Sequence, residues 1–293
     1  MKTTMANRIA LFFDLFKLRI GLVIGFTALA GLAVTPGHAP AGWRVALLAL
    51  AVVVSSAAAG AFNQYVERDT DARMARTRNR PFVSGRLKPS PSWLVVIVLM
   101  CLASAVVATV AANTLAALYT FLGAFVYGVV YTVWLKRRTW LNIVIGGLAG
   151  SFAVLAGAAA VAPDRLEGAP LWLAIVLFLW TPPHFWSLAI AYRSDYEAAR
   201  VPMLPTVVGD AKAARAILLS AVLLVLASIV PAWYGLSWLY LAAAIGGGAY
   251  FLRTSSALVL DPCRRTAMAN FHASLLQLTL LLAAAIVDAT LLH

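Results

Sequence analysis

Charged side chains are scarce in this chain, and their scarcity excludes an ordinary water-soluble domain. Asp, Glu, Lys and Arg make up 12% of the 293 residues, whereas 62% of the residues are hydrophobic. Soluble domains carry about twice that share of charge, and one core in a chain of this length is too small to bury so much apolar surface. The sequence therefore predicts a protein embedded in a lipid bilayer.

Cysteines and strand-like patterns are also sparse. Of the two cysteines, Cys101 lies in an apolar run and Cys263 in a basic segment, so a disulfide framework is not predicted. The alternating pattern of barrel strands is absent, and apolar residues instead form the long runs that spanning helices require. We predict an all-α, polytopic membrane protein in which residues 1–293 form a single domain.

The long apolar runs predict about nine transmembrane helices around a central cavity, the first of them an uncleaved span. The expected spans are 20–36, 43–64, 93–111, 114–134, 141–162, 170–192, 213–233, 235–253 and 270–292. About 20 apolar residues cross the hydrocarbon core of a bilayer, and each of these runs is close to that length.

Basic residues exceed acidic residues and give a net charge of +12. In membrane proteins Lys and Arg gather in cytoplasmic loops, and nine spans with a cytoplasmic N-terminus put all of them except Arg44 and Arg165 on that side. The charge therefore predicts a cytoplasmic N-terminus and an outer C-terminus. It does not predict nucleic-acid binding, for which the chain has no motif.

Polar side chains follow the second predicted span at its cytoplasmic end. Asn63, Glu67 and Asp71 are four residues apart, so a continuing helix would present all three on one face. Carboxylate and amide oxygens suit a hard cation such as Mg²⁺, and Arg76 and Arg80 follow within reach of phosphate oxygens. A solvated, salt-bridged segment is the alternative interpretation.

Two further polar segments are expected at the same membrane face. Asp195 and Tyr196 follow the sixth predicted span, which runs in the same direction as the second, so two clusters able to bind a metal could hold a diphosphate between them. Tyr131, Lys136 and Arg137 follow the fourth span and supply cations at this depth. Topology-setting charge is the alternative for the basic pair.

The sixth predicted span contains two consecutive prolines, Pro182 and Pro183, followed by His184. Prolines free backbone carbonyls, and such breaks are tolerated in a membrane where they line a cavity. A histidine inside a span is a functional candidate. The alternative is a kink whose histidine is bonded to a neighbouring helix.

These segments resemble the UbiA-type intramembrane prenyltransferases, and within them the protohaem IX farnesyltransferases. The resemblance covers nearly the whole chain and rests on Asn63-x3-Glu67-x3-Asp71, Arg76-Thr77-x2-Arg80-Pro81, Tyr131-Thr132-x2-Leu135-Lys136-Arg137, Thr181-Pro182-Pro183-His184-Phe185-Trp186, Asp195-Tyr196 with Pro202-Met203-Leu204-Pro205, and Lys17-Leu18-Arg19-Ile20. Ala191 and Ala199 stand where many members have a second aspartate, which leaves the number of Mg²⁺ ions open.

The resemblance implies farnesyl transfer from farnesyl diphosphate to the vinyl group of haem B, giving haem O and diphosphate at the inner (cytoplasmic) membrane. It implies that haem B is a substrate, that Mg²⁺ is a cofactor, that membrane lipid surrounds the protein, and that haem A synthase or a terminal oxidase is an assembly partner. By motif position, the expected metal ligands are Asn63, Glu67, Asp71 and Asp195; the expected diphosphate contacts are Arg76, Arg80, Lys136, Arg137 and Tyr131; and the haem-binding candidates are His184 and Tyr196.

Two other functions compete with this prediction. A UbiA-type enzyme with another aromatic or tetrapyrrole acceptor differs only in the sixth-span motif. A transporter would place carboxylates near the membrane midplane. In this chain the acidic residues gather at predicted helix ends, with Asp288 the exception.

Overall fold

The structure is a computed structural model that describes residues 5–291, with side chains from residue 9 onward. Every regular element within these residues is a helix. The elements are α1 Met5–Leu15, α2 Leu18–Ala33, α3 Gly42–Asp71, α4 Ser92–Ala111, α5 Thr114–Phe125, η1 Val126–Leu135, α6 Asn142–Gly146, α7 Leu148–Val161, α8 Ala169–Ala191, α9 Arg193–Ala198, α10 Leu204–Val208, α11 Asp210–Ile229, η2 Val230–Tyr234, α12 Trp238–Leu260 and α13 Arg264–Leu291. The predicted end of the last span, residue 292, lies outside the described part.

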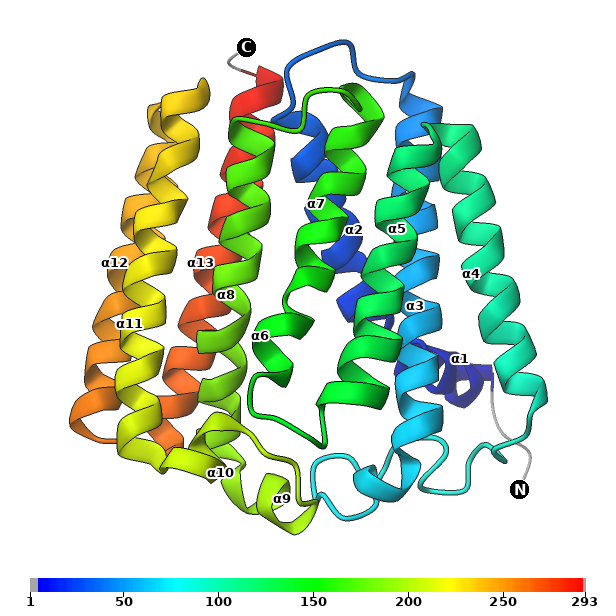
Figure 1. The fold of residues 1–293 in the computed structure, drawn as a ribbon, viewed down its shortest axis with the longest axis vertical. Coiled ribbons are helices and arrows are strands. Elements are labelled where there is room, and N and C mark those ends of the chain that lie inside the picture. The colour runs from blue at the N-terminus through cyan, green and yellow to red at the C-terminus, as the bar shows by residue number, and fades with distance from the viewer. Residues whose placement is uncertain (1–4, 292–293) are drawn as a thin grey trace.

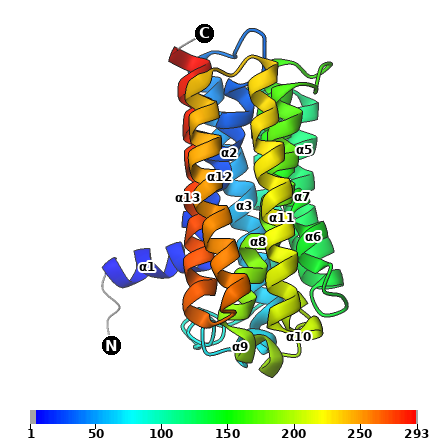
Figure 2. The same cartoon turned by 90° about the vertical axis from the view of Figure 1, so that its left-hand side faces the viewer.

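The long helices stand side by side as an upright bundle (Figure 1), and α1 projects sideways from its lower part (Figure 2). Consecutive long helices pack against each other from α2 to α13, with α6 and α7 together forming one member of the series. Helix α13 then returns to contact α2, which closes the series into a ring. This confirms the predicted all-α membrane bundle.

Seven helical segments in the described part are long and apolar enough to cross a bilayer. Helix α2 is shorter, with 16 residues, and α12 has 23 residues but is not among the seven. Each predicted span coincides with one of these nine helical segments, yet the count of nine transmembrane spans stays a prediction. The bundle is that of a multi-pass integral membrane protein.

Local sequence explains several helix ends. The Asn113 side chain accepts a hydrogen bond from the backbone of Ala116 at 2.9 Å and so caps α5, and Ser237 caps α12 in the same way through Leu239. Buried Asp288 of α13 also accepts bonds from Ser237 and from the backbone of Tyr240. The acidic residue that stood out within a predicted span thus stabilises the start of α12.

Helix α8 runs without interruption through its two prolines, where the sequence predicted a broken hydrogen-bond ladder. Hydroxyl groups bond to carbonyls in this part of the helix: Ser187 donates to the carbonyl of Pro183 at 2.6 Å, and Thr181 donates to that of Leu177 at 3.0 Å. These are not the carbonyls that lose a helical donor to the prolines, because Pro182 and Pro183 would pair with the carbonyls of Phe178 and Leu179, four residues earlier. The two prolines therefore remove two backbone donors from α8 but do not end the helix.

Helices α2 and α7 approach each other across the ring at two glycines. A Cβ atom at Gly157 would collide with the carbonyl oxygen of Ala28, and one at Gly31 would collide with the backbone of Val154. Small residues let membrane helices approach closely without a hydrophobic driving force between them. This contact divides the ring into two parts, with α3, α4 and α5 on one side and the remaining long helices on the other.

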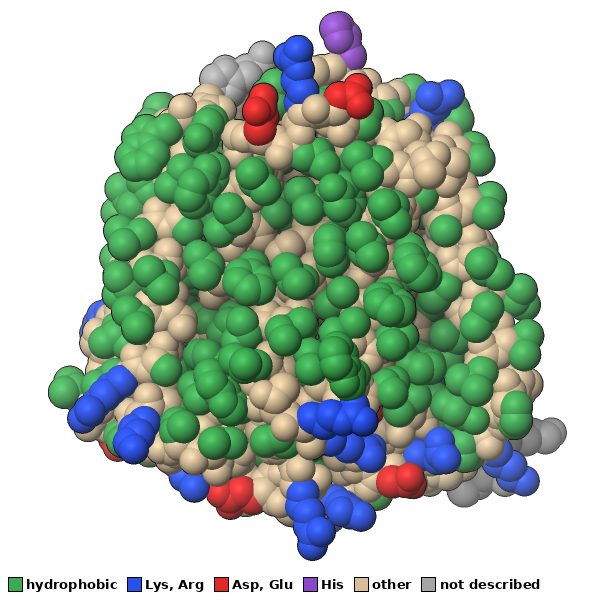
Figure 3. All heavy atoms as spheres, viewed as in Figure 1, with side chains coloured by type: hydrophobic (Ala, Val, Ile, Leu, Met, Phe, Trp, Pro, Cys, Tyr) green, Lys and Arg blue, Asp and Glu red, His purple; other side chains and the backbone are tan. Residues whose placement is uncertain are grey.

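Basic side chains concentrate at one end of the bundle. Figure 3 shows most Lys and Arg side chains on the visible face at the lower end, with apolar side chains covering the middle. The polar end of the molecule is the end where α3, η1 and α8 terminate (Figure 1).

Replacing Gly157 by alanine tests the α2–α7 contact. We expect Gly157→Ala to destabilise the protein by about 1–3 kcal/mol, because overpacking forces the backbones apart. Gly246→Ala is the matched control, since a Cβ at Gly246 meets no atom within 4 Å. Denaturant unfolding in detergent measures both, and equal stabilities would contradict the close contact.

Candidate active site

The lower end of α3 carries the three polar side chains that the sequence placed on one helical face. Helix α3 continues to Asp71, seven residues past the predicted end of the span at 64, and this continuation puts the three together. Asn63 is 2% exposed, and Glu67 and Asp71 are each 1% exposed. The Asn63 amide donates to Glu67 Oε2 at 2.8 Å and to Thr132 Oγ1 at 3.0 Å.

Each of these side chains also accepts a hydrogen bond from one cationic side chain. The contacts are Lys17 Nζ to Asn63 Oδ1 at 2.6 Å, Lys136 Nζ to Glu67 Oε2 at 2.5 Å, and Arg80 Nη1 to Asp71 Oδ2 at 2.5 Å. Three separate segments supply the cations: the link before α2, the end of η1 and the loop after α3. Buried carboxylates require such partners, because an unpaired buried charge is strongly destabilising.

The π-helical segment η1 shapes the site from the opposite side. The Lys136 backbone N–H donates to the Tyr131 carbonyl, five residues earlier, at 2.9 Å and closes a widened turn. The Thr132 hydroxyl donates to the Tyr127 carbonyl at 2.8 Å. The rings of Tyr127 and Tyr131 stack with centroids 5.7 Å apart. π-Helical turns recur at functional sites because they redirect side chains.

Asp195 of α9 meets the site through the loop that follows α3. Its two carboxylate oxygens each accept a backbone N–H, from Ala75 and from Arg76, at 3.1 Å. Arg76 lies over the ring of Tyr192 at 5.6 Å and donates to Tyr196 OH at 3.5 Å. The two predicted clusters are thus adjacent, but Asp195 holds the loop backbone and does not line the cavity beside Asp71.

A polar cavity of about 220 Å³ lies between these segments. The predicted residues that line it are Asn63, Asp71, Arg76, Arg80, Tyr131, Lys136 and Tyr196. Glu67 lies behind them, and Arg137 turns away to donate to Thr70 on α3 at 2.6 Å. Burial raises the pKa of Tyr196, against the opposing effect of Arg76, so this phenol stays protonated as a hydrogen-bond donor.

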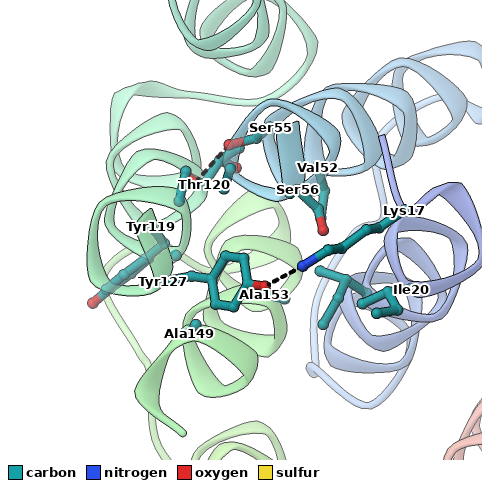
Figure 4. Close-up of a pocket in the computed structure, with 15 residues that line it drawn as sticks. Lys17, Ile20, Val52, Ser55, Ser56, Tyr119, Thr120, Tyr127, Ala149 and Ala153 are labelled. Atoms are coloured by element: carbon teal, nitrogen blue, oxygen red, sulfur yellow. Dashed lines mark hydrogen bonds between the residues drawn. The ribbon is translucent and has the colours of Figure 1, made fainter. Parts of the chain in front are cut away.

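A second, apolar cavity of about 100 Å³ lies inside the bundle (Figure 4). Most of its walls come from small or apolar side chains of α2, α3, α5 and α7. Lys17, Ile20 and Tyr127 line both cavities. A ligand with an anionic head and a hydrocarbon tail fits this pair of cavities, with its junction at these three residues.

His184 of α8 faces α13. It is not among the described residues that line the two cavities. Its Nδ1 is 2.7 Å from Ser274 Oγ, and its ring is stacked between Trp180 and Phe271, with centroid distances of 4.1 and 4.3 Å. These contacts match the alternative of a histidine bonded to a neighbouring helix. Its role as a haem ligand stays a prediction.

The sequence interpretation missed several residues of the site. Lys17 was assigned to topology and to a resemblance at the start of the chain, and Tyr127 was assigned to a membrane span. Thr77 donates to the Asp71 carbonyl at 2.9 Å and fixes the turn after α3. A lysine directly before a short apolar helix was the available signal for Lys17, but only the fold brings it to Asn63.

The oxygen-rich end of α3 fits a divalent cation. Glu67 Oε1 is buried and has no hydrogen-bond partner in the described residues, and a buried carboxylate oxygen without a donor suits a metal ion. No three His, Cys, Asp or Glu side chains within residues 5–291 are grouped to hold a metal by themselves. Asn63 and oxygens of a phosphate ligand would therefore complete the coordination, as Mg²⁺ favours.

Sequence comparisons place the chain among known proteins. The profile of the UbiA prenyltransferase family matches residues 24–282. The chain is 56% identical over 275 residues to protoheme IX farnesyltransferase 2 of Paramagnetospirillum magneticum, covering 94% of this chain and 95% of the relative. It is 41% identical over 281 residues to protoheme IX farnesyltransferase of Alkalilimnicola ehrlichii, covering 94% and 91%.

Solved structures share the fold. A structure of digeranylgeranylglyceryl phosphate synthase is similar with a TM-score of 0.78 at 17% identity, covering 96% of this chain and 98% of the other. A UbiA homologue from Archaeoglobus fulgidus, bound to DMAPP and Mg²⁺, is similar with a TM-score of 0.69 at 12% identity, covering 92% and 98%. These likenesses support the bundle described above.

The Lys136–Glu67 pair can be tested by removing its cation. We expect Lys136→Met to destabilise the protein by about 3 kcal/mol, because Glu67 would remain buried and unpaired. Adding Glu67→Gln should recover most of this loss. Arg138→Met, at an exposed neighbour, is the control. Denaturant unfolding in detergent decides, and a stable single variant would contradict the pairing.

The contacts of His184 lead to a separate prediction. We expect His184→Ala to lower the free energy of unfolding by about 1–3 kcal/mol, because stacking and a buried hydrogen bond are lost. We also expect the Soret band of haem-loaded protein to keep its position, since the ring is held between helices. A shifted Soret band would instead identify His184 as an iron ligand.

Proposed function

The chain belongs to the UbiA prenyltransferase family, and on that premise we propose that it transfers a farnesyl group from farnesyl diphosphate to the vinyl group of haem B. Water adds to the second vinyl carbon, and haem O and diphosphate are the products. The relatives named protoheme IX farnesyltransferase, 56% and 41% identical, support the acceptor. They do not favour another aromatic or tetrapyrrole acceptor.

One observation carries the donor half of this proposal: the polar and apolar cavities meet at Lys17, Ile20 and Tyr127. Farnesyl diphosphate is divided in the same way into a charged diphosphate group and an apolar hydrocarbon chain. Its diphosphate would lie among the cationic side chains of the polar cavity. Its hydrocarbon chain would extend between the helices, where apolar walls exclude water.

We assign the metal-binding role to Asn63, Glu67 and Asp71. The unpartnered Glu67 Oε1 supports this assignment, and the A. fulgidus homologue with Mg²⁺ and DMAPP is consistent with it. When bound, Mg²⁺ would neutralise part of the diphosphate charge. Asp195, whose two oxygens hold the Ala75 and Arg76 amides, would contribute by fixing the loop that carries Arg76.

The basic side chains of the site would stabilise the departing diphosphate. Arg76, Arg80 and Lys136 line the polar cavity, and preorganised cations aimed at developing negative charge are a strong source of catalysis. Arg137 does not line this cavity; its charge would stabilise the diphosphate from a greater distance, because its side chain donates to Thr70. Breaking the carbon–oxygen bond leaves an allylic cation, which the electron-rich haem vinyl carbon attacks.

Water must stay away from this cation until the new carbon–carbon bond has formed. Ala, Gly, Val and Ile make up most of the lining of the apolar cavity, and the hydroxyl groups of Ser55 and Thr120 in that lining already donate to backbone carbonyls. Tyr131 and Tyr196 line the polar cavity from η1 and α9. We propose Tyr196 as a contact of the haem, because its protonated phenol lines the polar cavity beside Arg76.

The membrane orientation follows from the charge distribution. We propose that the basic end of the bundle faces the cytoplasm in the inner membrane, with the N-terminus inside and the C-terminus outside. The concentration of Lys and Arg at one end (Figure 3) supports this orientation. The active site would then draw its diphosphate substrate from the cytoplasmic side.

The reaction is tested by incubating purified protein with haem B, farnesyl diphosphate and Mg²⁺. We expect a product with the mass of haem O, and its rate of formation to fall by about 10²–10³-fold in Asp71→Ala, because a metal ligand and the partner of Arg80 are lost. Asp69→Ala is the matched control, because Asp69 is exposed on another face of α3. A wild type that forms no haem O, or a fully active Asp71→Ala, would refute the assignment.

A further inference from the structure

Lys17 occupies a position that neither the charge pattern nor the comparisons assign to a function. It lies immediately before α2 with a left-handed backbone, φ 47° and ψ 42°. Residues other than glycine adopt this conformation rarely and at an energetic cost. The side chain turns into the bundle, where Nζ donates to Asn63 Oδ1 at 2.6 Å and to Tyr127 OH at 3.0 Å.

Lys17 also stands where the polar and apolar cavities join. Figure 4 shows its ammonium pointing at the Tyr127 hydroxyl, with Ile20 beside it. A prenyl diphosphate that fills both cavities has its C1–O bond at this junction. Among the three residues common to both cavities, Lys17 is the one with a cationic side chain, so its ammonium would lie beside the oxygen that leaves C1.

The Lys17–Asn63 contact differs in kind from the other two cation contacts of the site. Glu67 and Asp71 each have two carboxylate oxygens, and each gives one of them to a cation. Asn63 has a single side-chain oxygen, and the Lys17 ammonium already donates to it. A metal ion on that oxygen would lie next to the ammonium, and like charges repel strongly where water is excluded.

We propose that Lys17 couples metal binding to diphosphate binding by exchanging partners. Its ammonium leaves Asn63 Oδ1 for the diphosphate oxygen attached to C1, and Asn63 becomes free to bind the metal. When the C1–O bond breaks, the electron pair stays on that oxygen, and the ammonium stabilises the new charge by hydrogen bonding. This inference rests on the proposed function and adds a catalytic residue to it.

The exchange predicts opposite effects of one substitution on two equilibria. Lys17→Gln keeps a hydrogen-bond donor but removes the charge. We expect it to raise the affinity for Mg²⁺ alone about tenfold and to lower the affinity for inorganic pyrophosphate at saturating Mg²⁺ about tenfold, within the usual range for coupled sites. Titration calorimetry on the full-length protein in lipid nanodiscs measures both.

Two further variants separate this mechanism from a general effect of charge. Arg19→Gln removes the same charge from an exposed residue two positions away and should change neither affinity. Lys17→Arg keeps the charge and should stay close to the wild type in both titrations. Lys17→Met should reproduce the two opposite shifts, and it serves as the second test if Lys17→Gln fails to fold.

The outcomes distinguish this inference from the proposed function. If the wild type binds Mg²⁺ and pyrophosphate together, but loss of the Lys17 charge leaves the affinity for Mg²⁺ unchanged or lowers it, the partner exchange is wrong and the diphosphate site stands. If the wild type binds no pyrophosphate even with Mg²⁺, the proposed function fails and this inference fails with it.

Discussion

The whole site depends on the pairing of buried oxygens with buried cations at the end of α3. Glu67 and Asp71 are almost fully enclosed, and an enclosed charge is tolerated only when an opposite charge and hydrogen bonds accompany it. Lys136 and Arg80 supply the opposite charges from η1 and from the loop after α3. The site therefore forms only when these segments come together, and the same ion pairs that hold the segments in place also build the site.

The bundle turns this charged end into two compartments. The glycine contact between α2 and α7 draws these two helices together across the ring, and the apolar cavity lies between α2, α3, α5 and α7. The polar cavity lies at the same end as the basic surface. An amphiphilic substrate can thus place its charge among cations and its reactive carbon beside an apolar cavity, and electrostatic stabilisation is stronger beside apolar walls than in water.

The sequence was sufficient for features that depend on local spacing and insufficient for features that depend on distant contacts. Low charge and long apolar runs predicted the helical membrane bundle, and the four-residue spacing predicted that Asn63, Glu67 and Asp71 share a face. The contact of Lys17 with Asn63 joins residues 46 positions apart, and that of His184 with Ser274 joins residues 90 apart. No periodicity encodes such pairs, and the π-helical turns of η1 were hidden inside an ordinary apolar run.

The structure gives Asp195 a role that does not need a second acidic side chain beside it. Asp195 lacks an acidic neighbour four residues away, because Ala191 and Ala199 stand at those positions. Its two oxygens accept the backbone amides of Ala75 and Arg76, which uses the carboxylate to order the loop after α3. A carboxylate committed to two amides is a weak candidate for a second metal ion, so we infer that the catalytic charge balance rests on one metal-binding face, that of α3, and on the cations gathered around it.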